Sequence, residues 1–190
     1  DQVSSNNQDP VVTKTDTDGN VVWEVSHDET SADARAEYIA LGPNEHPYVV
    51  FTVDGGSNEN GRFQANHAED GAFADAPFPS YGSGGGAKVS VLARLDPQTG
   101  DIEAGTFVIA VLSSGNTNTL SPEGIEIADD GTVRFAAESR YWPPAPEATS
   151  DNWQRHPDAA QEDDGWDLLI SLPADLTRFT AVEITDTGSD

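Results

Sequence analysis

The sequence predicts an all-β protein built from antiparallel hairpins, and three observations support this fold class. Short runs of β-branched and aromatic residues recur along the chain, bounded by Gly, Asp, Asn and Pro. Helical periodicity is weak, and the only candidate for a short helix is Ser31–Tyr38. The hairpins also recur in similar order. A length of 190 residues fits a single domain, 1–190.

The first half of the chain contains two expected hairpins. Val11–Thr15 should pair with Val21–Val25 across DTDGN, because Gly and Asn accept the positive φ that tight turns require. Residues 37–51, EYIALGPNEHPYVVF, predict a second hairpin around a Gly-Pro-Asn turn. The segment 57–86 is polar and rich in glycine, so we expect a loop there.

The second half repeats this order. Residues 88–112 predict a hairpin over PQTG, and residues 124–138 predict another over Asp-Asp-Gly. A loop rich in Pro and Trp, 140–164, precedes a last hairpin at 166–185. The expected repeat units are 11–56, 87–139 and the half unit 165–186.

These hairpins match one another residue by residue, which indicates an internal repeat of about 80 residues. The first hairpins align with offsets of 80 and 77 residues, and the second hairpins align with an offset of 86: Lys14 with Arg94 and Ser171, Ile39 with Ile125, Leu41 with Ile127, Val49 with Phe135, and Phe51 with Ala137. Four antiparallel strands per unit are typical of β-propeller blades, so the sequence predicts about two and a half propeller-type repeats.

Two and a half blades cannot close a ring, because propellers typically need about 4–8 blades. Three arrangements would cover the open faces. Further repeats of a longer chain could follow, two copies could pair, or the strands could form a β-sandwich or irregular barrel instead.

Several stretches resemble a known family. KTDTDGNVVW, ARLDPQTGDIEAGTF and IEIADDGTVRFAAES resemble bacterial secreted β-propeller repeats, often called seven-bladed-propeller repeats, and GGGAKVSVLARLDPQTG is similar to cyanobacterial surface-protein paralogues. The resemblance implies a secreted, periplasmic or cell-surface protein and supplies no catalytic residue. The polar start DQVSSNNQDP also looks like the stub that remains after signal-peptide cleavage.

The charge balance excludes some partners. The chain has 34 acidic and 9 basic residues, a net charge of −25, and no cysteine. Nucleic-acid binding needs clustered Lys and Arg, so we expect no nucleic-acid partner. No apolar run approaches the roughly 20 residues that a membrane helix needs, so we expect no membrane insertion. The acidic surface favours solubility in salt or affinity for divalent cations.

Asp16, Asp18 and Asn20 are the candidate metal ligands. They stand at alternate positions, as in the opening of a calcium loop, and Ca²⁺ is the expected ion if any cofactor binds. The alternative is that DTDGN is only a hairpin turn.

Four aromatic residues form the candidate ligand site: Tyr141, Trp142, Trp153 and Trp166. Flat aromatic faces beside polar side chains suit sugar stacking or a peptide groove. Alternatively, the tryptophans anchor the loop on the sheets as a plug.

The sequence therefore favours a secreted or cell-surface non-enzymatic scaffold for binding or assembly, with a protein or glycan as its partner and a homo-oligomer or further repeats as its assembly. One alternative is a carbohydrate-binding module, assisted by calcium. A second is a hydrolase whose acidic residues, such as those in Glu162–Asp167, converge from separate loops.

Overall fold

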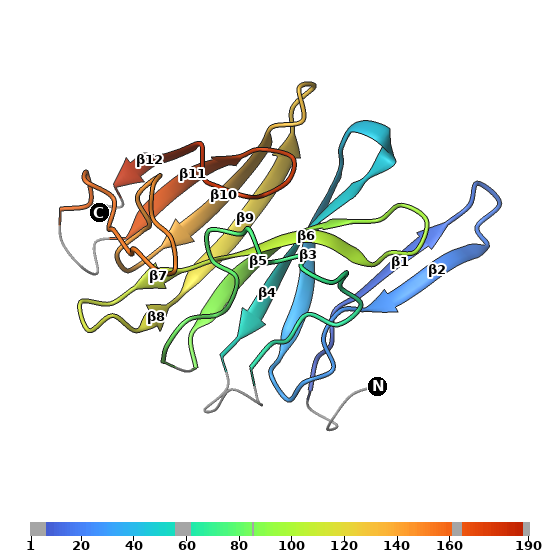
Figure 1. Ribbon diagram of the computed structural model, residues 1–190, viewed down its shortest axis with the longest axis horizontal. Helices are drawn as coiled ribbons and strands as arrows, with labels where there is room; N and C mark the ends of the chain where they lie inside the picture. The colour runs from blue at the N-terminus through green and yellow to red at the C-terminus, as the bar shows by residue number, and fades with distance from the viewer. Residues whose placement is uncertain (1–6, 56–61, 85, 161–164, 188–190) are drawn as a thin grey trace.

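The computed structural model describes residues 7–55, 62–84, 86–160 and 165–187, and it confirms the all-β fold class (Figure 1). One short 3₁₀ helix, η1 (Pro43–Glu45), accompanies the strands. The strands are β1 (Val11–Thr15), β2 (Val21–Ser26), β3 (Ala34–Leu41), β4 (Pro47–Asp54), β5 (Lys88–Leu95), β6 (Ile102–Val108), β7 (Ala110–Val111), β8 (Thr117–Asn118), β9 (Leu120–Ile127), β10 (Val133–Ser139), β11 (Trp166–Leu172) and β12 (Ala181–Thr187). None of the described helices is long and apolar enough to span a membrane.

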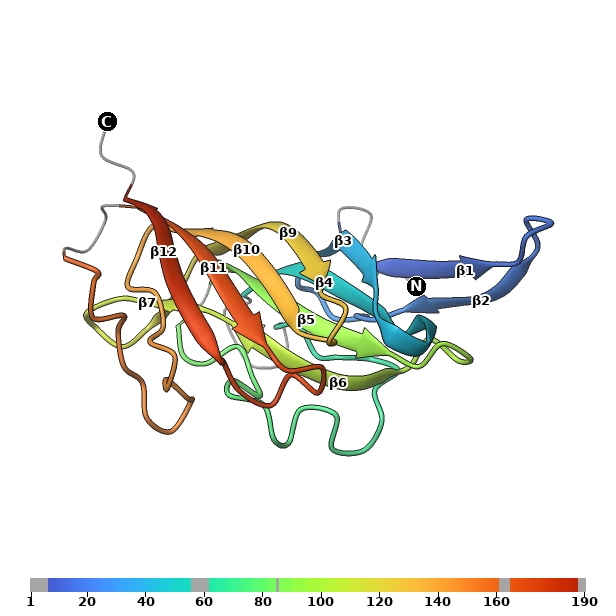
Figure 2. The same cartoon turned by 90° about the horizontal axis from the view of Figure 1, so that it is seen from above.

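These strands form four antiparallel sheets, and the described strands close no barrel. Two sheets have four strands, in the orders β3-β4-β5-β6 and β9-β10-β11-β12; the pairs β1-β2 and β7-β8 form the other two. Figures 1 and 2 show the two larger sheets side by side, with the β1–β2 hairpin projecting at the far end from β12. The long loops that follow β4 and β10 lie on the same side of the sheets in Figure 2.

The expected assignment of hairpins to sheets is wrong. We expected units 11–56 and 87–139 each to form one sheet, but each large sheet joins the second hairpin of one unit to the first hairpin of the next. The physical reason is the closure of the long loop between β4 and β5. Gly55 N–H donates to the Ala87 carbonyl at 2.9 Å, and the Tyr81 hydroxyl donates to the same oxygen at 2.8 Å. The loop therefore returns β5 to the edge of β4.

The two large sheets have equivalent pairing registers. Ile39 pairs with Val49 in the first sheet, and at the offset of 86 residues Ile125 pairs with Phe135 in the second. The next strand pairs also agree: Tyr48 lies opposite Arg94, and Arg134 lies opposite Ser171. A bulge occurs at the same place in both edge strands, at Glu37 of β3 and Glu123 of β9. The sequence alignment therefore matches the strand pairing.

The β1–β2 hairpin has the register of β5–β6. Lys14 pairs with Trp23 and Thr15 with Val21, so Val22 is skipped as a bulge. In β5–β6, Arg94 pairs with Ala104 and Leu95 with Ile102, so Glu103, the residue equivalent to Val22, is skipped. The β1–β2 hairpin thus corresponds to the second half of a large sheet, and no described strand takes the place of a first half beside it.

Neighbouring sheets contact each other through equivalent residues. Lys14 Nζ donates to the carbonyl oxygen of Pro97 at 2.7 Å, in the turn of the next sheet. Arg94 Nη1 donates in the same way to the carbonyl of Ala174 at 3.1 Å, in the turn between β11 and β12. An aromatic residue adds a bond to each oxygen, from Trp23 Nε1 at 3.2 Å and from the Tyr48 hydroxyl at 3.0 Å.

The core follows this packing. Phe51, Val91, Phe135 and Ile170 lie on the central strands of the two large sheets and are fully buried. The segment Ser31–Tyr38, the only candidate helix, instead supplies most of edge strand β3, because pairing with β4 outweighs its modest helix preference.

Candidate functional site

The aromatic loop between β10 and β11 was the main candidate ligand site. Trp142 follows the end of β10, and Trp166 is the first residue of β11. Their rings stack, with centroids 5.9 Å apart and planes inclined by 24°. The Arg155 guanidinium carbon lies 4.6 Å from the centroid of the Trp142 ring, and Trp142 Nε1 donates to Ser113 Oγ at 3.2 Å.

This packing leaves both rings covered. Trp166 is fully buried and Trp142 nearly so, and Tyr141 is half-buried against the core. Trp142 also ties the loop to β7, because its carbonyl accepts from Val111 N–H at 3.1 Å. In this arrangement Trp142 and Trp166 anchor the loop, which fits the alternative interpretation of a plug.

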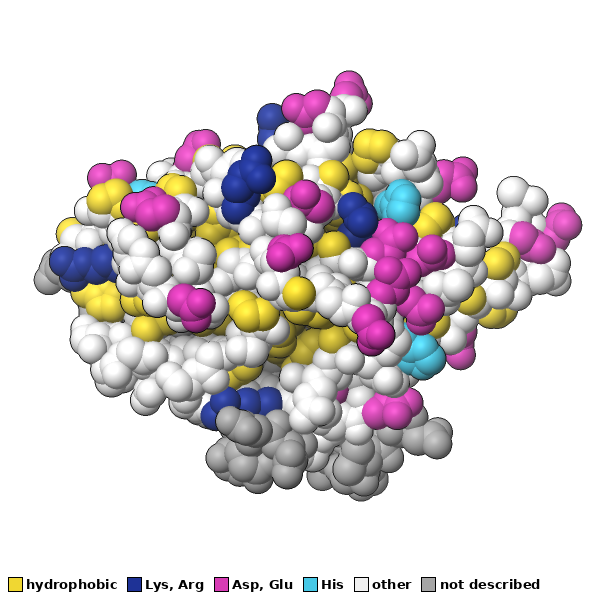
Figure 3. Space-filling model, viewed as in Figure 1, with side chains coloured by type: hydrophobic (Ala, Val, Ile, Leu, Met, Phe, Trp, Pro, Cys, Tyr) yellow, Lys and Arg dark blue, Asp and Glu magenta, His cyan; other side chains and the backbone are white. Residues whose placement is uncertain are grey.

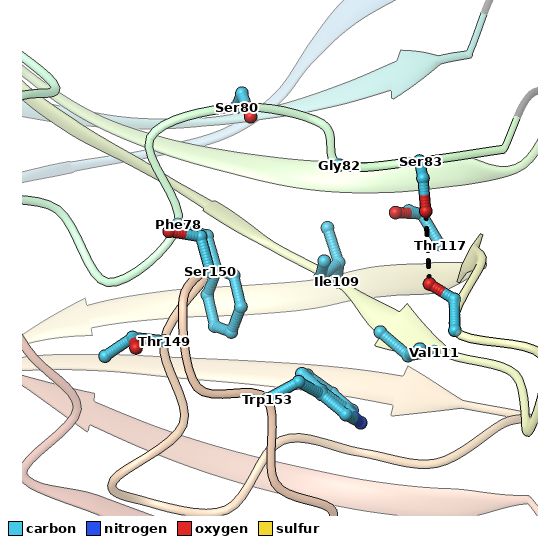
Figure 4. Close-up of a pocket in the computed structure, with 11 residues that line it drawn as sticks. Phe78, Ser80, Gly82, Ser83, Ile109, Val111, Thr117, Thr149, Ser150 and Trp153 are labelled. Atoms are coloured by element: carbon cyan, nitrogen blue, oxygen red, sulfur yellow. Dashed lines mark hydrogen bonds between the residues drawn. The ribbon is translucent and has the colours of Figure 1, made fainter.

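Trp153 is different, because it is half-buried and lines a cavity of about 170 Å³ (Figure 4). The cavity lies between the two long loops: Phe78 from one loop packs 5.9 Å from the Trp153 ring, and Ser150 N–H donates to the Pro77 carbonyl at 2.8 Å. Ile109 and Val111 form its apolar side. Trp153 thus differs in position and exposure from Trp142 and Trp166, which are buried.

The polar lining of this cavity consists of hydroxyl groups without any charged side chain. They belong to Ser80, Ser83, Thr117, Thr149 and Ser150. Three of them are used in the fold: Ser83 Oγ donates to the Gly115 carbonyl at 3.1 Å, and Thr117 Oγ1 donates to the Tyr81 carbonyl at 2.7 Å. Thr149 Oγ1 accepts from Asn152 N–H at 3.2 Å. An aromatic ring beside several hydroxyls can hold a small polyol, but the cavity is below the roughly 300–1,000 Å³ of typical ligand pockets.

The candidate calcium ligands Asp16, Asp18 and Asn20 lie in the turn between β1 and β2. Asp16 Oδ1 accepts from the N–H groups of Asp18 and Asn20 at 2.9 and 2.8 Å, and Asp16 Oδ2 accepts from Asn20 Nδ2 at 2.9 Å. These hydrogen bonds, that of the Asn20 side chain first, lower the pKa of Asp16. Both carboxylate oxygens therefore serve the turn.

Three other hairpin turns use an aspartate in the same way. Asp96 Oδ1 accepts from Gln98 and Thr99 N–H at 2.6 and 2.9 Å, Asp130 Oδ1 from Thr132 N–H at 2.9 Å, and Asp175 Oδ1 from Thr177 N–H at 3.3 Å. This is the Asx-turn chemistry that favours Asp at the start of a turn. The recurrence supports a structural role for the aspartate of DTDGN.

Acidic side chains gather over the β5–β6 turn, with histidines and a basic residue beside them (Figure 3). Ligand atoms of Glu69, Asp96 and Glu103 lie within 4.8 Å of one another. Glu103 is neutralised by Arg94 at 3.0 Å and faces His46 Nδ1 at 3.1 Å, while turn hydrogen bonds from Gln98 and Thr99 lower the pKa of Asp96.

A glycosidase acid has a raised pKa, whereas the pKa of Asp96 is lowered, so Asp96 does not suit that role in the hydrolase alternative. Of the Glu162–Asp167 run, only Gly165, Trp166 and Asp167 lie within the described residues, and Asp167 is part of β11. The other acidic residues of that run, Glu162, Asp163 and Asp164, lie outside the described residues.

Comparison with known proteins adds no family to these observations. The chain matches no protein-family model and no curated protein sequence. Any functional statement about the chain therefore depends on its own geometry.

Proposed function

We propose that this chain is a non-enzymatic assembly scaffold built from propeller-type repeats, and that its open half-sheet joins a second copy. The observation that carries the proposal is the equivalence of β1–β2 and β5–β6. The two hairpins share register, bulge and an aspartate-capped turn, but β5 has β4 beside it, whereas β2 is the only described strand that pairs with β1.

The contact between neighbouring sheets supports a directional series of repeats. Lys14 and Arg94 each donate to a turn carbonyl of the next sheet. The equivalent residue of the last sheet is Ser171, whose short side chain lacks the reach and the charge for this contact. Among the described strands, this contact is therefore not repeated after β11–β12, and no strand lies beside β1 in the place that β4 takes beside β5.

The apolar surface supports the same open side. The most exposed large hydrophobic side chains of the described residues all lie on β1, β2 and β3: Val11, Val21, Val22, Tyr38, Ile39 and Leu41. Leu41 is 70% exposed and Val21 60%. Beside them, a groove of about 360 Å³ runs between the hairpin and η1, lined by Trp23 and Pro47 among others. Exposed apolar patches of this kind mark interaction surfaces.

The edge of β1 favours a second copy as the occupant. Natural edge strands are protected by charges, proline or bulges. Edge strand β9 has Pro122 and a bulge, β12 has Glu183, and the loop before β5 covers β6 through Ala72 and Phe78. Strand β1, VVTKT, has neither proline nor an acidic residue in a chain of net charge −25. Its one charged side chain, Lys14, is bound to the Pro97 carbonyl of the next sheet. Two copies can therefore join β1 to β1 about a two-fold axis, which completes an antiparallel four-stranded sheet.

The test is the molar mass in solution, measured by size-exclusion chromatography with light scattering over a range of concentrations. We expect a dimer that dissociates on dilution. Val11→Glu should weaken it at least about tenfold, because it places two carboxylates at the shared edge. Gln98→Glu adds the same charge on an exposed turn and should leave the dimer intact. A monomer at every concentration would overturn the proposal.

We also place the scaffold outside the cytoplasm, as a secreted, periplasmic or surface-displayed protein. The support is its charge: a chain with 34 acidic residues and a net charge of −25 is tolerated best in saline surroundings, where screening limits self-repulsion. Fractionation of the source cells tests this placement, and recovery of the protein only with the cytosol would contradict it.

A second candidate function, binding of a single sugar unit, is favoured by the cavity at Trp153. It combines one accessible aromatic ring with hydroxyl groups from both long loops. A glycan array tests it. Trp153→Ala removes the ring that lines the cavity and should abolish any signal. Trp142→Ala removes a covered ring and should weaken binding only by loosening the loop between β10 and β11. An empty array, or a signal that survives Trp153→Ala, would end this candidacy.

A further inference from the structure

Buried oxygen atoms meet at the base of the β1–β2 hairpin. Residues 7–9 lead into β1, and residues 28–30 follow the end of β2. Asn7 is only 3% exposed and Asp28 is fully buried, while Asp9 is half-buried. Such polar groups are normally hydrogen-bonded in full.

Two of these oxygens have no partner among the described residues: Asn7 Oδ1 and Asp9 Oδ2 are buried and accept no hydrogen bond. The Asn7 side-chain nitrogen donates to the Thr30 carbonyl at 3.0 Å and to Asp9 Oδ1. The carboxamide therefore lies between the Asp9 carboxylate and the Thr30 carbonyl. Rotation of this carboxamide by a half turn exchanges its oxygen and nitrogen, which turns Asn7 Oδ1 toward Asp9 Oδ1 and the Thr30 carbonyl oxygen.

A second carboxylate, that of Asp28, lies at the same junction and contacts Thr30 through both of its oxygens. Asp28 Oδ1 accepts from Thr30 N–H at 3.1 Å and Gln64 N–H at 3.4 Å, and Asp28 Oδ2 accepts from Thr30 Oγ1 at 3.1 Å. Burial, and to a smaller extent the charge of Asp9, raises the pKa of Asp28 to about 6. Within the described part of the chain, no ion pair reaches Asp9 or Asp28.

We propose that Asn7, Asp9, Asp28 and the Thr30 carbonyl hold a hard divalent cation, with calcium the best-fitting ion. Every donor is an oxygen, and the set combines two carboxylates, a carboxamide and a backbone carbonyl. Calcium takes 6–8 such oxygens in irregular geometry and accepts water for the remainder, whereas magnesium demands a near-ideal octahedron. The cation supplies the partner that the buried Asn7 and Asp9 oxygens lack.

Such a site has a mechanical consequence for the hairpin. Asn7 and Asp9 belong to the strand that enters β1, and Asp28 and Thr30 belong to the bend between β2 and β3. Backbone bonds already join these segments, because His27 N–H donates to the Pro10 carbonyl at 3.0 Å and Ala34 N–H to the Gln8 carbonyl at 2.7 Å. The cation closes the same junction and fixes the hairpin on the first large sheet.

The experiment is a calorimetric titration of calcium chloride into the full chain after chelator treatment, in a potassium chloride background that screens diffuse binding to the acidic surface. We expect one saturable equivalent. At about 100 times the dissociation constant, the melting temperature should rise by about 5–10 °C. Magnesium chloride should give a smaller shift at the same concentration.

The variants separate this site from the other acidic groups. Asp9→Asn and Asp28→Asn should weaken calcium binding at least about tenfold, whereas Asp16→Asn, in the turn between β1 and β2, should leave it unchanged. Because Asp28→Asn could disturb folding, Asn7→Asp is the second variant: it adds a carboxylate ligand and should tighten binding. The absence of a saturable equivalent in the wild type, or its loss in Asp16→Asn and retention in Asp9→Asn, would overturn the proposal.

Discussion

The β1–β2 and β5–β6 hairpins have nearly the same local structure but different neighbouring strands. Both have a cation that reaches the next sheet, a bulge two residues into the second strand, and a turn that begins with an aspartate. Strand β5 is buried at most positions because β4 lies beside it, whereas β1 alternates and exposes Val11 by 50%. Local sequence therefore sets the hairpin, and the neighbouring strand decides how far it is buried.

The turn glycines give the largest expected difference between the two hairpins. Gly100 and Gly19 both have φ above 80°, but a Cβ on Gly100 would lie 2.7 Å from the Trp23 ring, and one on Gly19 would meet nothing within 4 Å. Gly100→Ala should cost about 2–4 kcal/mol and Gly19→Ala only about 1 kcal/mol of backbone strain. Urea unfolding of dilute protein measures the loss of stability in both variants. Equal losses would contradict the packing of the Trp23 ring against Gly100 in the β5–β6 turn.

Matched valines test the effect of the missing neighbour. Val91 in β5 is fully buried, and its equivalent in β1 is Val11. Val91→Ala should lower the free energy of unfolding by about 2 kcal/mol, from lost burial and the cavity. Val11→Ala should change it by no more than about 0.5 kcal/mol in the monomer. A loss at Val11 as large as at Val91 would mean that β1 already has a neighbour.

The sheet-to-sheet contact gives a third comparison. Arg94→Met and Lys14→Met each remove a charged donor from a turn carbonyl and should cost about 1–2 kcal/mol, with the larger loss at Arg94 because it also neutralises Glu103. Ser171→Arg introduces the cation at a position beyond which the described residues form no further sheet, and it should leave stability unchanged. Thermal melting of the three variants checks this order; stabilisation by Ser171→Arg would indicate an acceptor that the series does not predict.

The smallest expected effect is the pH dependence of stability that comes from Asp96. The N–H groups of Gln98 and Thr99 lower the pKa of Asp96 below its usual value, so this carboxylate stabilises the fold above a pH of about 4, and that contribution is lost as the pH falls through the lowered pKa. Because Asp96 is near the surface, the effect should stay below about 1 kcal/mol. Asp96→Asn keeps the acceptor and should make stability less sensitive to pH in that window, as measured by unfolding from pH 5 to pH 2. An unaltered pH profile would contradict the assignment.

Much of the fold could be predicted from the sequence, because strands and tight turns have local signals. The boundaries of β1 and β2 and the match of Ile39 with Ile125 were readable from alternation, turn residues and spacing. The order of hairpins within the sheets was not, because it depends on hydrogen bonds across a long loop, such as those that Gly55 and Tyr81 make to Ala87. No local sequence pattern in the loop between β4 and β5 predicts these hydrogen bonds.

The candidate sites were less predictable for a related reason. Aromatic residues in a Pro-rich loop indicate a site or an anchor equally well, and only their packing separates Trp153 from Trp142. The DTDGN motif had the residue types of a calcium loop, but its aspartate caps the turn. The group around Asn7 and Asp28 joins segments about twenty residues apart, and its signal is an unpartnered buried oxygen, which a sequence does not display.

The central claim is that β1 is the open edge of half a sheet that a second copy completes. Hydrogen–deuterium exchange of the β1 amides, compared between dilute and concentrated protein, tests it most directly. We predict that protection of residues 11–15 rises with concentration while protection of β5, already paired on both sides, stays constant. Exchange in β1 that is independent of concentration would contradict the account.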